Sequence, residues 1–377
     1  MRAAVIGAGF AGLIISRALA SIGYDVTLYE EHDRVGYPPH CTGIVSERVV
    51  REIGGPARET ILASYRGVLF RGGGSEFRVT TSQRIYKLDR ERLEELLLEE
   101  ALSYGVRPVF RRRVKRITAD GRLWLGGEEA RFDIIILAEG SRRRLLSEAL
   151  GVKYNPLESV GVNVEVQEAS SGEDIIEVGF DEGLSGRGFY WIVPIDGKTV
   201  VGALSLDAGR AQRAADSLAS KRGGRITRRY GGIVVHGPPL SRNPLGKVIV
   251  VGDAAGLNKP LTGGGLYPNS EVARISVESG DVVRAVKVVS GKLRRQHYVA
   301  KAILENPGLA TLLVQAASEA GFERMLAGRI DFDEHEKLPL AVVKSPHRLA
   351  YMLTAIAFRD PRGALSLTMA GLKSLIL

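Results

Sequence analysis

The fold is decided by two stretches, Ala3-Ala-Val-Ile-Gly7-Ala-Gly9-Phe-Ala-Gly12 near the start and Lys247-Val-Ile-Val-Val-Gly-Asp-Ala-Ala-Gly256 in the second half. In each of them a short β-branched run ends at glycines, which permit tight turns and close approach of the backbone to a ligand. The first has the strand–turn–helix pattern of a dinucleotide-binding motif. A second glycine-rich loop, Pro260-Leu-Thr-Gly-Gly-Gly265, follows the other. Together the two stretches predict a site for FAD.

Each glycine of the first motif has a distinct physical task. Gly7 permits the tight turn after the strand, Gly9 lets the chain approach a pyrophosphate, and Gly12 allows close packing of helix on strand. A helix expected over residues 11–22 directs its positive end at the phosphates. The next predicted strand ends in Glu30, where an acidic residue binds the hydroxyl groups of a ribose.

Composition places the chain among ordinary globular proteins. Its 377 residues, 45% hydrophobic and 25% charged, suffice for two domains and an extension. No apolar run reaches the ~18 residues of a membrane span, and the first strand begins too early for a signal peptide. We therefore expect a cytoplasmic protein. The single cysteine excludes an intramolecular disulfide framework, and the six histidines have no metal-ligand spacing, so no metal site is predicted.

The formal net charge of +9 indicates either an anionic partner or a basic surface exposed to solvent. Basic clusters occur at 111–116, 142–144 and 221–229. Nucleic acid, an anionic membrane or lipid phosphate, and an arginine-rich solvated surface are the alternatives. We predict no nucleic-acid partner, because the clusters are not interleaved with aromatic residues and aromatic content is only 6%.

The order of the patterns predicts an α/β protein: a Rossmann-like FAD-binding domain with an inserted antiparallel-sheet substrate domain and a helical C-terminal extension. Short alternating strands are expected at 160–166, 175–180 and 199–202, and a helix capped by Asp89 is expected over 89–102. An insertion of this kind forms a wall over the cofactor, where a substrate binds. The expected division is 1–60, 85–150 and 245–290 for the FAD-binding domain, 61–84 and 151–244 for the substrate domain, and 291–377 for the helical region.

These motifs resemble the geranylgeranyl reductases, within the flavoproteins that share the para-hydroxybenzoate hydroxylase architecture. Two motifs narrow the resemblance: Pro38-Pro-His-Cys41-Thr-Gly43 matches the reductases' PxxCxG, and Phe189-Tyr-Trp191-Ile-Val-Pro194 is similar to their aromatic-x-Trp-x-Phe-Pro. The resemblance spans roughly residues 1–281. The motifs shared with the wider architecture are Gly7–Gly12, Asp89-Arg90, Ala138-Glu-Gly140 and Gly252-Asp-Ala-Ala-Gly256.

The resemblance implies reduction of isolated carbon–carbon double bonds in a prenyl chain, with hydride from reduced flavin. It implies that Cys41 lies close to the flavin ring, and that Phe189, Trp191 and Pro194 line a prenyl tunnel. Asp253 would bind the ribityl chain, and the helix after Gly264–Gly265 would direct its amides at the ring. The residues expected to bind the cofactor are Gly7, Gly9, Phe10, Ala11, Gly12, Glu30, Cys41, Arg90, Gly252, Asp253, Gly263, Gly264 and Gly265. The residues expected to act on the substrate are Cys41, Trp191 and Phe189.

The residues also admit simpler interpretations. Cys41 could instead be a small buried apolar residue, and Trp191 an ordinary aromatic residue of the core. Arg90 could be a surface residue at the start of a helix. The second motif departs from the family's pattern, with Phe189 in place of tyrosine, Val193 in place of phenylalanine, and a closing glycine pair reduced to Gly202-Ala-Leu204. The Ala138-Glu-Gly motif has glutamate in place of aspartate. These departures leave FAD binding intact and the identity of the hydrophobic substrate open.

Three functions compete. The first is a reductase acting on archaeal-type prenyl lipids or prenyl diphosphates, with a ferredoxin-like or nicotinamide electron donor. The others are a flavin monooxygenase, against which Gly256 argues weakly, and an electron carrier docking at a membrane or ferredoxin. The apolar segment 364–377, near Lys344, His347, Arg348, Arg359 and Arg362, fits either an interfacial helix on the inner face of an anionic membrane or a core-packing tail.

Overall fold

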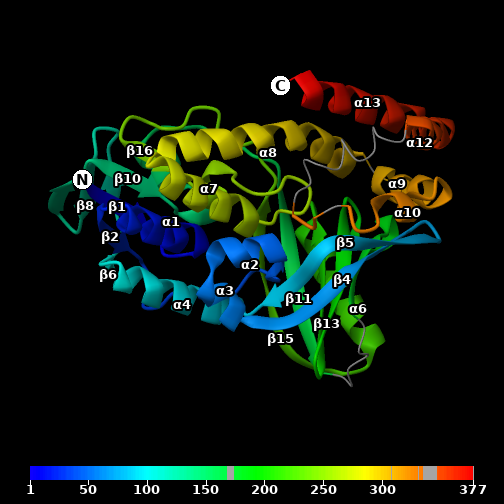
Figure 1. The fold of residues 1–377 in the computed structure, drawn as a ribbon, viewed down its shortest axis with the longest axis horizontal. Coiled ribbons are helices and arrows are strands. Elements are labelled where there is room, and N and C mark those ends of the chain that lie inside the picture. Colours follow the sequence, from blue (N-terminus) through cyan, green and yellow to red (C-terminus); the bar gives the residue numbers. More distant parts are fainter. Residues whose placement is uncertain (168–173, 307, 330, 334–345, 377) are drawn as a thin grey trace.

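The computed structural model describes residues 1–167, 174–306, 308–329, 331–333 and 346–376. Lys344 and Leu377, named above with the C-terminal segment, lie outside these ranges. Figure 1 shows two sheets at opposite ends of the molecule, with a layer of helices lying along one side of both.

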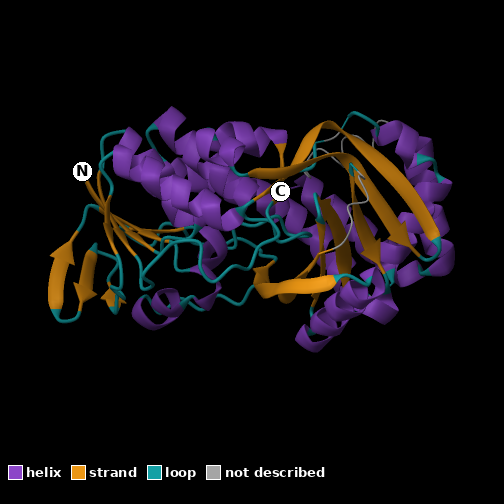
Figure 2. Cartoon of the chain, turned by 90° about the horizontal axis from the view of Figure 1, so that it is seen from below, coloured by secondary structure: helices purple, strands orange, loops and turns teal. Residues whose placement is uncertain are grey.

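The first sheet has five parallel strands in the order β16-β10-β1-β2-β6. Its central strands are almost wholly buried and apolar, as expected for a parallel sheet covered on both faces. A three-stranded meander, which the sequence patterns did not predict, extends this end of the molecule (Figure 2). The strands are β1 (Arg2–Ile6), β2 (Asp25–Tyr29), β6 (Arg107–Val109), β10 (Ile134–Leu137) and β16 (Val248–Val250), with β7 (Arg116–Ile117), β8 (Arg122–Leu125) and β9 (Glu128–Arg131) in the meander.

The second sheet has eight strands in the order β15-β11-β14-β13-β12-β4-β5-β3. It was expected to be antiparallel, but β12 pairs with β4 in parallel, because β4 comes from a separate, earlier segment of chain. β3 and the last residues of β5 also belong to this sheet, although they lie in ranges assigned to the FAD-binding domain. The strands are β3 (Ile44–Ser46), β4 (Ile61–Gly72), β5 (Ser75–Leu88), β11 (Glu158–Gln167), β12 (Ile175–Phe180), β13 (Gly188–Ile195), β14 (Lys198–Ser205) and β15 (Arg225–Val235).

The two faces of the second sheet differ in chemistry. On β11, Val162, Val164 and Val166 pack with helix α6 (Ala208–Arg222) in one apolar cluster. The alternating residues Asn163 and Glu165 therefore point to the opposite face. That polar and aromatic face belongs to the candidate site.

Helices close the molecule around the two sheets. The expected caps form: Asp89 accepts hydrogen bonds from the amides of Glu91 and Arg92 at the start of α4. Among the described residues, no helix is long and apolar enough to cross a bilayer. The remaining helices are α1 (Phe10–Ser21), α2 (Glu47–Ile53), α3 (Gly55–Glu59), α4 (Arg90–Ser103), α5 (Glu182–Ser185), α7 (Leu266–Ser279), α8 (Val282–Glu305), α9 (Leu309–Glu319), α10 (Phe322–Leu326), α12 (Pro346–Arg359) and α13 (Pro361–Ile376).

Candidate functional site

The N-terminal glycine motif packs against the Ala138-Glu-Gly motif. A Cβ atom on Gly7 would lie 2.3 Å from the carbonyl oxygen of Ala138, and one on Gly12 would lie 1.8 Å from the carbonyl oxygen of Gly7. Both positions therefore require glycine. Glu139 accepts the amides of Leu145 and Leu146 at 2.7 and 2.8 Å, so its carboxylate supports the following turn. Burial raises the pKa of that carboxyl group, and the two amides lower it in part.

The start of α1 is open to a ligand. Gly9 precedes the helix, and a Cβ atom there would meet nothing within 4 Å. The N-cap residue makes no side-chain hydrogen bond and the first turn has no acidic residue, so the N-terminal amides of α1 are left available to an anion. Beside them, Glu30 accepts the amide of Ala8 at 2.7 Å and contacts the His32 ring at 2.6 Å. This places the acid next to the turn, where it was predicted to bind a ribose.

The Gly-Asp turn meets the same helix from the opposite end of the chain. A Cβ atom on Gly252 would lie 3.0 Å from the Cβ of Ala11, so the two glycine motifs are in contact. The Gly252 amide donates to Asn269, and Asp253 accepts from the side-chain amide of Asn258 at 3.0 Å. The two stretches that decided the fold thus form one surface.

The Cys41 loop is held by the start of α4. The amide of Gly36 donates to Glu94, and Glu94 also pairs with Arg90. A Cβ atom on Gly43 would lie 2.9 Å from Cγ of Arg90, while the Gly43 amide lies 3.4 Å from Cys41 Sγ. Burial lowers the pKa of the Arg90 guanidinium, but Cys41 and Glu94 raise it more, so the net shift is upward. Arg90 is therefore a buried cation beside Cys41, not a surface residue.

The Pro260–Gly265 loop is held from the second sheet. Nδ1 of His236 donates to the carbonyl of Pro260 at 2.6 Å, and Nε2 lies 2.7 Å from the hydroxyl of Ser159. Burial lowers the pKa of His236 to about 4, so the neutral ring makes both contacts. A Cβ atom on Gly263 would lie 1.9 Å from Val234, which leaves no room for another residue at that position.

An amide oxygen joins the Cys41 loop to the aromatic residues of β13. Oδ1 of Asn163 accepts the hydroxyl of Thr42 at 2.7 Å and the indole N–H of Trp191 at 3.1 Å. A Cβ atom on Gly202 would lie 2.3 Å from the Trp191 ring, so the indole occupies the space above this glycine. Trp191 is only half-buried, unlike an ordinary core aromatic. Because Asn163 links the indole to Thr42 of the Cys41 loop, this position favours a role in the site over a role in core packing.

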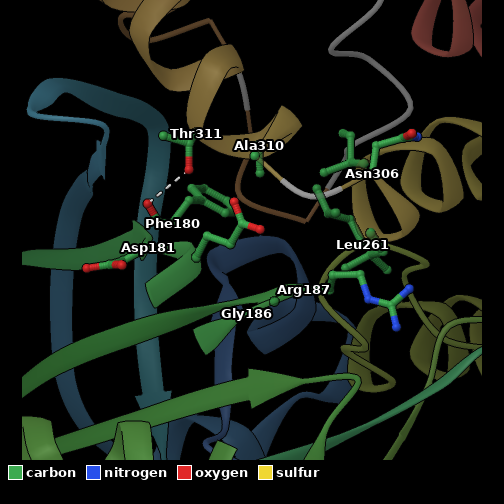
Figure 3. Close-up of a pocket in the computed structure, with 13 residues that line it drawn as sticks. Phe180, Asp181, Gly186, Arg187, Leu261, Asn306, Ala310 and Thr311 are labelled. Atoms are coloured by element: carbon green, nitrogen blue, oxygen red, sulfur yellow. Dashed lines mark hydrogen bonds between the residues drawn. The ribbon is translucent and has the colours of Figure 1, made fainter. Parts of the chain in front are cut away.

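Aromatic rings continue from Trp191 towards a hollow at the surface. Phe189 lies 5.8 Å from Trp191 and 5.9 Å from Phe180, between ring centroids. Figure 3 shows Phe180 in the wall of a small cavity of about 20 Å³, with Leu261 of the glycine-rich loop and Arg187 in the same lining. A larger hollow of about 270 Å³ adjoins it and shares Arg187. The larger hollow is lined mainly by polar and charged residues, among them Glu182, Asp207 and Arg210, so the apolar surface here consists of the aromatic rings and Leu261 of the predicted flavin loop.

Buried titratable groups near Cys41 were missed by the sequence patterns. Lys87 is 5% exposed, and its ammonium donates to the carbonyl of Leu88 at 2.7 Å. Burial lowers its pKa to about 8, and Cys41 and Glu165 oppose that shift. Burial raises the pKa of the nearby Tyr230 hydroxyl, and Glu165 and Cys41 raise it further. Lys87 lies on the same strand face as the buried Ile85, where an apolar residue is usual, whereas Asn163 lies at the polar position of an alternating strand and gave no signal.

The described residues fit a flavin dinucleotide. The open helix start beside Glu30 suits a pyrophosphate and a ribose. Among the buried side-chain atoms that have no hydrogen-bond partner within the described residues are Nε of Arg90 and Oγ1 of Thr262. Arg90 lies beside the Cys41 loop and Thr262 within the Pro260–Gly265 loop, and a bound polar group would satisfy both atoms.

Comparison with known proteins agrees with this arrangement. A family model described as an NAD(P)-binding Rossmann-like domain matches residues 5–55. Digeranylgeranylglycerophospholipid reductase 2 of Methanopyrus kandleri is 27% identical over 313 residues, covering 73% of this chain and 75% of the relative. The chain is homologous to these lipid reductases. The family resemblance predicted from the motifs is confirmed.

Solved structures with the same fold include reductase-like and oxygen-using flavoproteins. A geranylgeranyl bacteriochlorophyll reductase-like protein from Thermoplasma acidophilum superposes with a TM-score of 0.75 at 17% identity, covering 98% of each chain. A probable FAD-dependent monooxygenase from Pseudomonas aeruginosa has a TM-score of 0.60 at 17% identity, covering 85% of this chain and 96% of the other. The predicted Rossmann-like architecture is confirmed, and the fold is shared by enzymes of different chemistry.

Pairwise contacts connect most of the predicted residues: Ala11 meets Gly252, and Glu30 binds the turn before α1. Arg90 links the groups, because its guanidinium lies 5.5 Å from the Phe10 ring centroid and its side chain contacts the Cys41 loop, which Asn163 joins to Trp191. Gly256 has a packing role, because a Cβ atom there would lie 2.1 Å from the hydroxyl of Tyr154. It therefore does not bear on the choice between reductase and monooxygenase.

Proposed function

We propose that this protein is an FAD-dependent reductase that saturates carbon–carbon double bonds in the geranylgeranyl or polyprenyl chains of archaeal-type lipids or their precursors. The observation that carries the proposal is the Thr42–Asn163–Trp191 bridge. It joins the PxxCxG loop to the aromatic wall formed by Trp191 and Phe189, and would so set the cofactor opposite an apolar surface. The curated relatives named for reduction of such lipids support the same substrate class.

The proposed roles follow from the geometry. The open start of α1 and Glu30 would hold the pyrophosphate and ribose, and Asp253 and the Pro260–Gly265 loop would hold the ribityl chain and ring. Reduced FAD, when bound, supplies the hydride that adds to one alkene carbon, while a proton must reach the other carbon. An unactivated alkene offers no polar handle, so the protein contributes positioning and exclusion of water. Trp191 and Phe189 would orient the chain, and Cys41 would face the reacting carbons.

A second part of the proposal concerns where the lipid is met. Helices α12 and α13 lie across α8 and α9 at the edge of the molecule (Figure 1). They expose large apolar side chains, with Phe358 86% and Leu365 65% accessible. Asp360 is the only acidic residue among residues 346–376, which also contain four Lys or Arg residues. An apolar face with basic flanks suits peripheral contact with an anionic bilayer.

Anaerobic reduction of a prenyl substrate tests the reductase proposal. Dithionite replaces the physiological donor, for which ferredoxin-like and nicotinamide classes are both candidates. We expect geranylgeranyl phospholipid or diphosphate to gain two hydrogens for each double bond, measured by mass spectrometry. Oxygen consumption coupled to a hydroxylated product would instead establish the monooxygenase. Electron transfer to a quinone or ferredoxin without change in the lipid would establish the carrier.

Vesicle sedimentation tests the membrane contact. We expect anionic vesicles to bind the wild-type protein, and the triple variant Phe358→Ser, Leu365→Ser, Met369→Ser to lose that binding. Ile233, also an exposed apolar residue but on β15, offers the matched control Ile233→Ser. Equal binding by the triple variant would exclude α12 and α13 as the contact surface.

A further inference from the structure

A buried ion pair ties the C-terminal region to the glycine-rich loop. Nζ of Lys259 lies 2.5 Å from Oδ1 of Asp333, and the two side chains are 5% and 2% exposed. The Lys259 ammonium also lies 4.9 Å from the ring centroid of Phe332. Phe332 in turn packs with the apolar cluster that includes Trp191. The short segment 331–333 therefore lies between the loop and the aromatic wall.

The same carboxylate reaches the strand that follows the Cys41 loop. Oδ2 of Asp333 accepts the amide of Ser46 at 2.6 Å, and Asp331 accepts the amide of Asp333 at 2.8 Å. Ser46 lies three residues beyond Gly43 of the PxxCxG motif. One carboxylate thus connects the Pro260–Gly265 loop to the strand that directly follows the Cys41 loop, and both loops are predicted to lie at the flavin ring.

Lys259 also shapes its loop from within. Its amide donates to the carbonyl of Gly264 at 3.0 Å, and its carbonyl accepts the amide of Gly263 at 2.8 Å. A Cβ atom on Gly264 would lie 2.7 Å from Cε of Lys259, so the lysine side chain runs directly beneath that glycine. Displacement of the ammonium would therefore move Gly264 and the turn that it closes with Lys259.

Stability alone is a weak reason for this pair. Removing two charges from water costs several kcal/mol per ion, and apolar replacements of buried pairs are often neutral or stabilising. We propose that Asp333 and Lys259 are positioning residues that set the Pro260–Gly265 loop for FAD and make the C-terminal region part of the cofactor site. The inference rests on the proposed function, because it assumes that this loop contacts the flavin.

Flavin titration of the apoprotein tests the inference. We expect Asp333→Asn and Lys259→Met each to weaken FAD binding at least tenfold, followed by quenching of flavin fluorescence. The asparagine of the first variant keeps an oxygen for the Ser46 amide but removes the counter-charge of Lys259. The double variant is expected to bind FAD no more weakly than the weaker single variant, because the pair acts as one unit. At saturating FAD, both single variants are expected to shift the visible flavin absorption bands.

Lys292→Met is the matched control. Lys292 lies 2.5 Å from the buried Glu271 and joins α8 to α7, outside the loop. We expect this variant to lower the free energy of unfolding without changing FAD affinity or the flavin spectrum. FAD affinities within threefold of wild type in folded Asp333→Asn and Lys259→Met would overturn the inference. Failure of the wild-type protein to bind FAD would instead overturn the proposed function.

Discussion

Replacing Asn163 by leucine tests how the aromatic wall is held. The side chain is 2% exposed, and its single oxygen accepts two donors, from Thr42 and Trp191. Leucine has nearly the same shape but no acceptor, so both donors lose their partner. At roughly 1–2 kcal/mol for each partly buried donor, we expect the free energy of unfolding to fall by about 2–4 kcal/mol. The freed indole should also lose its fixed orientation.

Trp191 provides the assay, because the chain has only two tryptophans. In a Trp124→Phe background, urea unfolding followed by tryptophan fluorescence reports on Trp191 alone. We expect Asn163→Leu to lower the unfolding midpoint and shift the native emission. Prenyl reduction should decrease while FAD affinity stays unchanged, because the side-chain hydrogen bonds of Asn163 within the described residues go to Thr42 and Trp191 and not to the glycine motifs.

A double-mutant cycle with Thr42→Val isolates the coupling. Removal of the hydroxyl leaves only the indole to lose its acceptor, so Asn163→Leu should then cost about 1–2 kcal/mol less than in wild type. A loss below about 0.5 kcal/mol in the single variant, or no coupling to Thr42, would refute the reasoning.

Three further substitutions test separate parts of the site. Gly202→Ala places a Cβ atom 2.3 Å from the Trp191 ring, so the free energy of unfolding should fall by about 1–3 kcal/mol. Turnover should fall while FAD affinity stays unchanged, and an equal loss of flavin binding would contradict this. Gly12→Ala places a Cβ atom 1.8 Å from the carbonyl oxygen of Gly7, so α1 must move and flavin titration should show lost binding. Normal FAD affinity would show that the turn tolerates the shift. Burial lowers the pKa of Lys87 from 10.5 to about 8. Between pH 8 and pH 10.5 the folded state has released this proton while the unfolded state still holds it, so the free energy of unfolding should rise with pH across that window. Lys87→Met should raise the free energy of unfolding by roughly 3 kcal/mol at pH 7 and abolish that rise; equal pH profiles of the variant and wild type would contradict this.

Local signals in the sequence were sufficient to predict most of the elements that form the expected cofactor site. Gly7 and Gly12 were predictable because a strand–turn–helix motif constrains neighbouring residues, and Asp89 because a helix cap acts over three residues. The expected helix over 11–22 forms over Phe10–Ser21, a difference of one residue at each end. Such features depend on short stretches of chain and are visible within them.

Contacts between distant segments were not predictable in the same way. The bridge from Thr42 to Asn163 spans 121 residues, and the contact of Ser46 with Asp333 spans 287. Asn163 appeared only as the polar partner in an alternating strand, a position that usually faces solvent. The parallel pairing of β4 with β12 likewise depends on where separate segments enter the sheet. These features follow from tertiary packing, which no local pattern encodes.

The central claim is that an FAD site and a prenyl-binding path meet at Cys41 and Trp191. Its most direct test is flavin absorbance after anaerobic reduction, on addition of a geranylgeranyl lipid or of the same lipid with saturated chains. The account predicts reoxidation by the unsaturated lipid alone, with two hydrogens gained for each flavin reoxidised. Reduced flavin that persists with both lipids but reoxidises rapidly with oxygen or a quinone would contradict it.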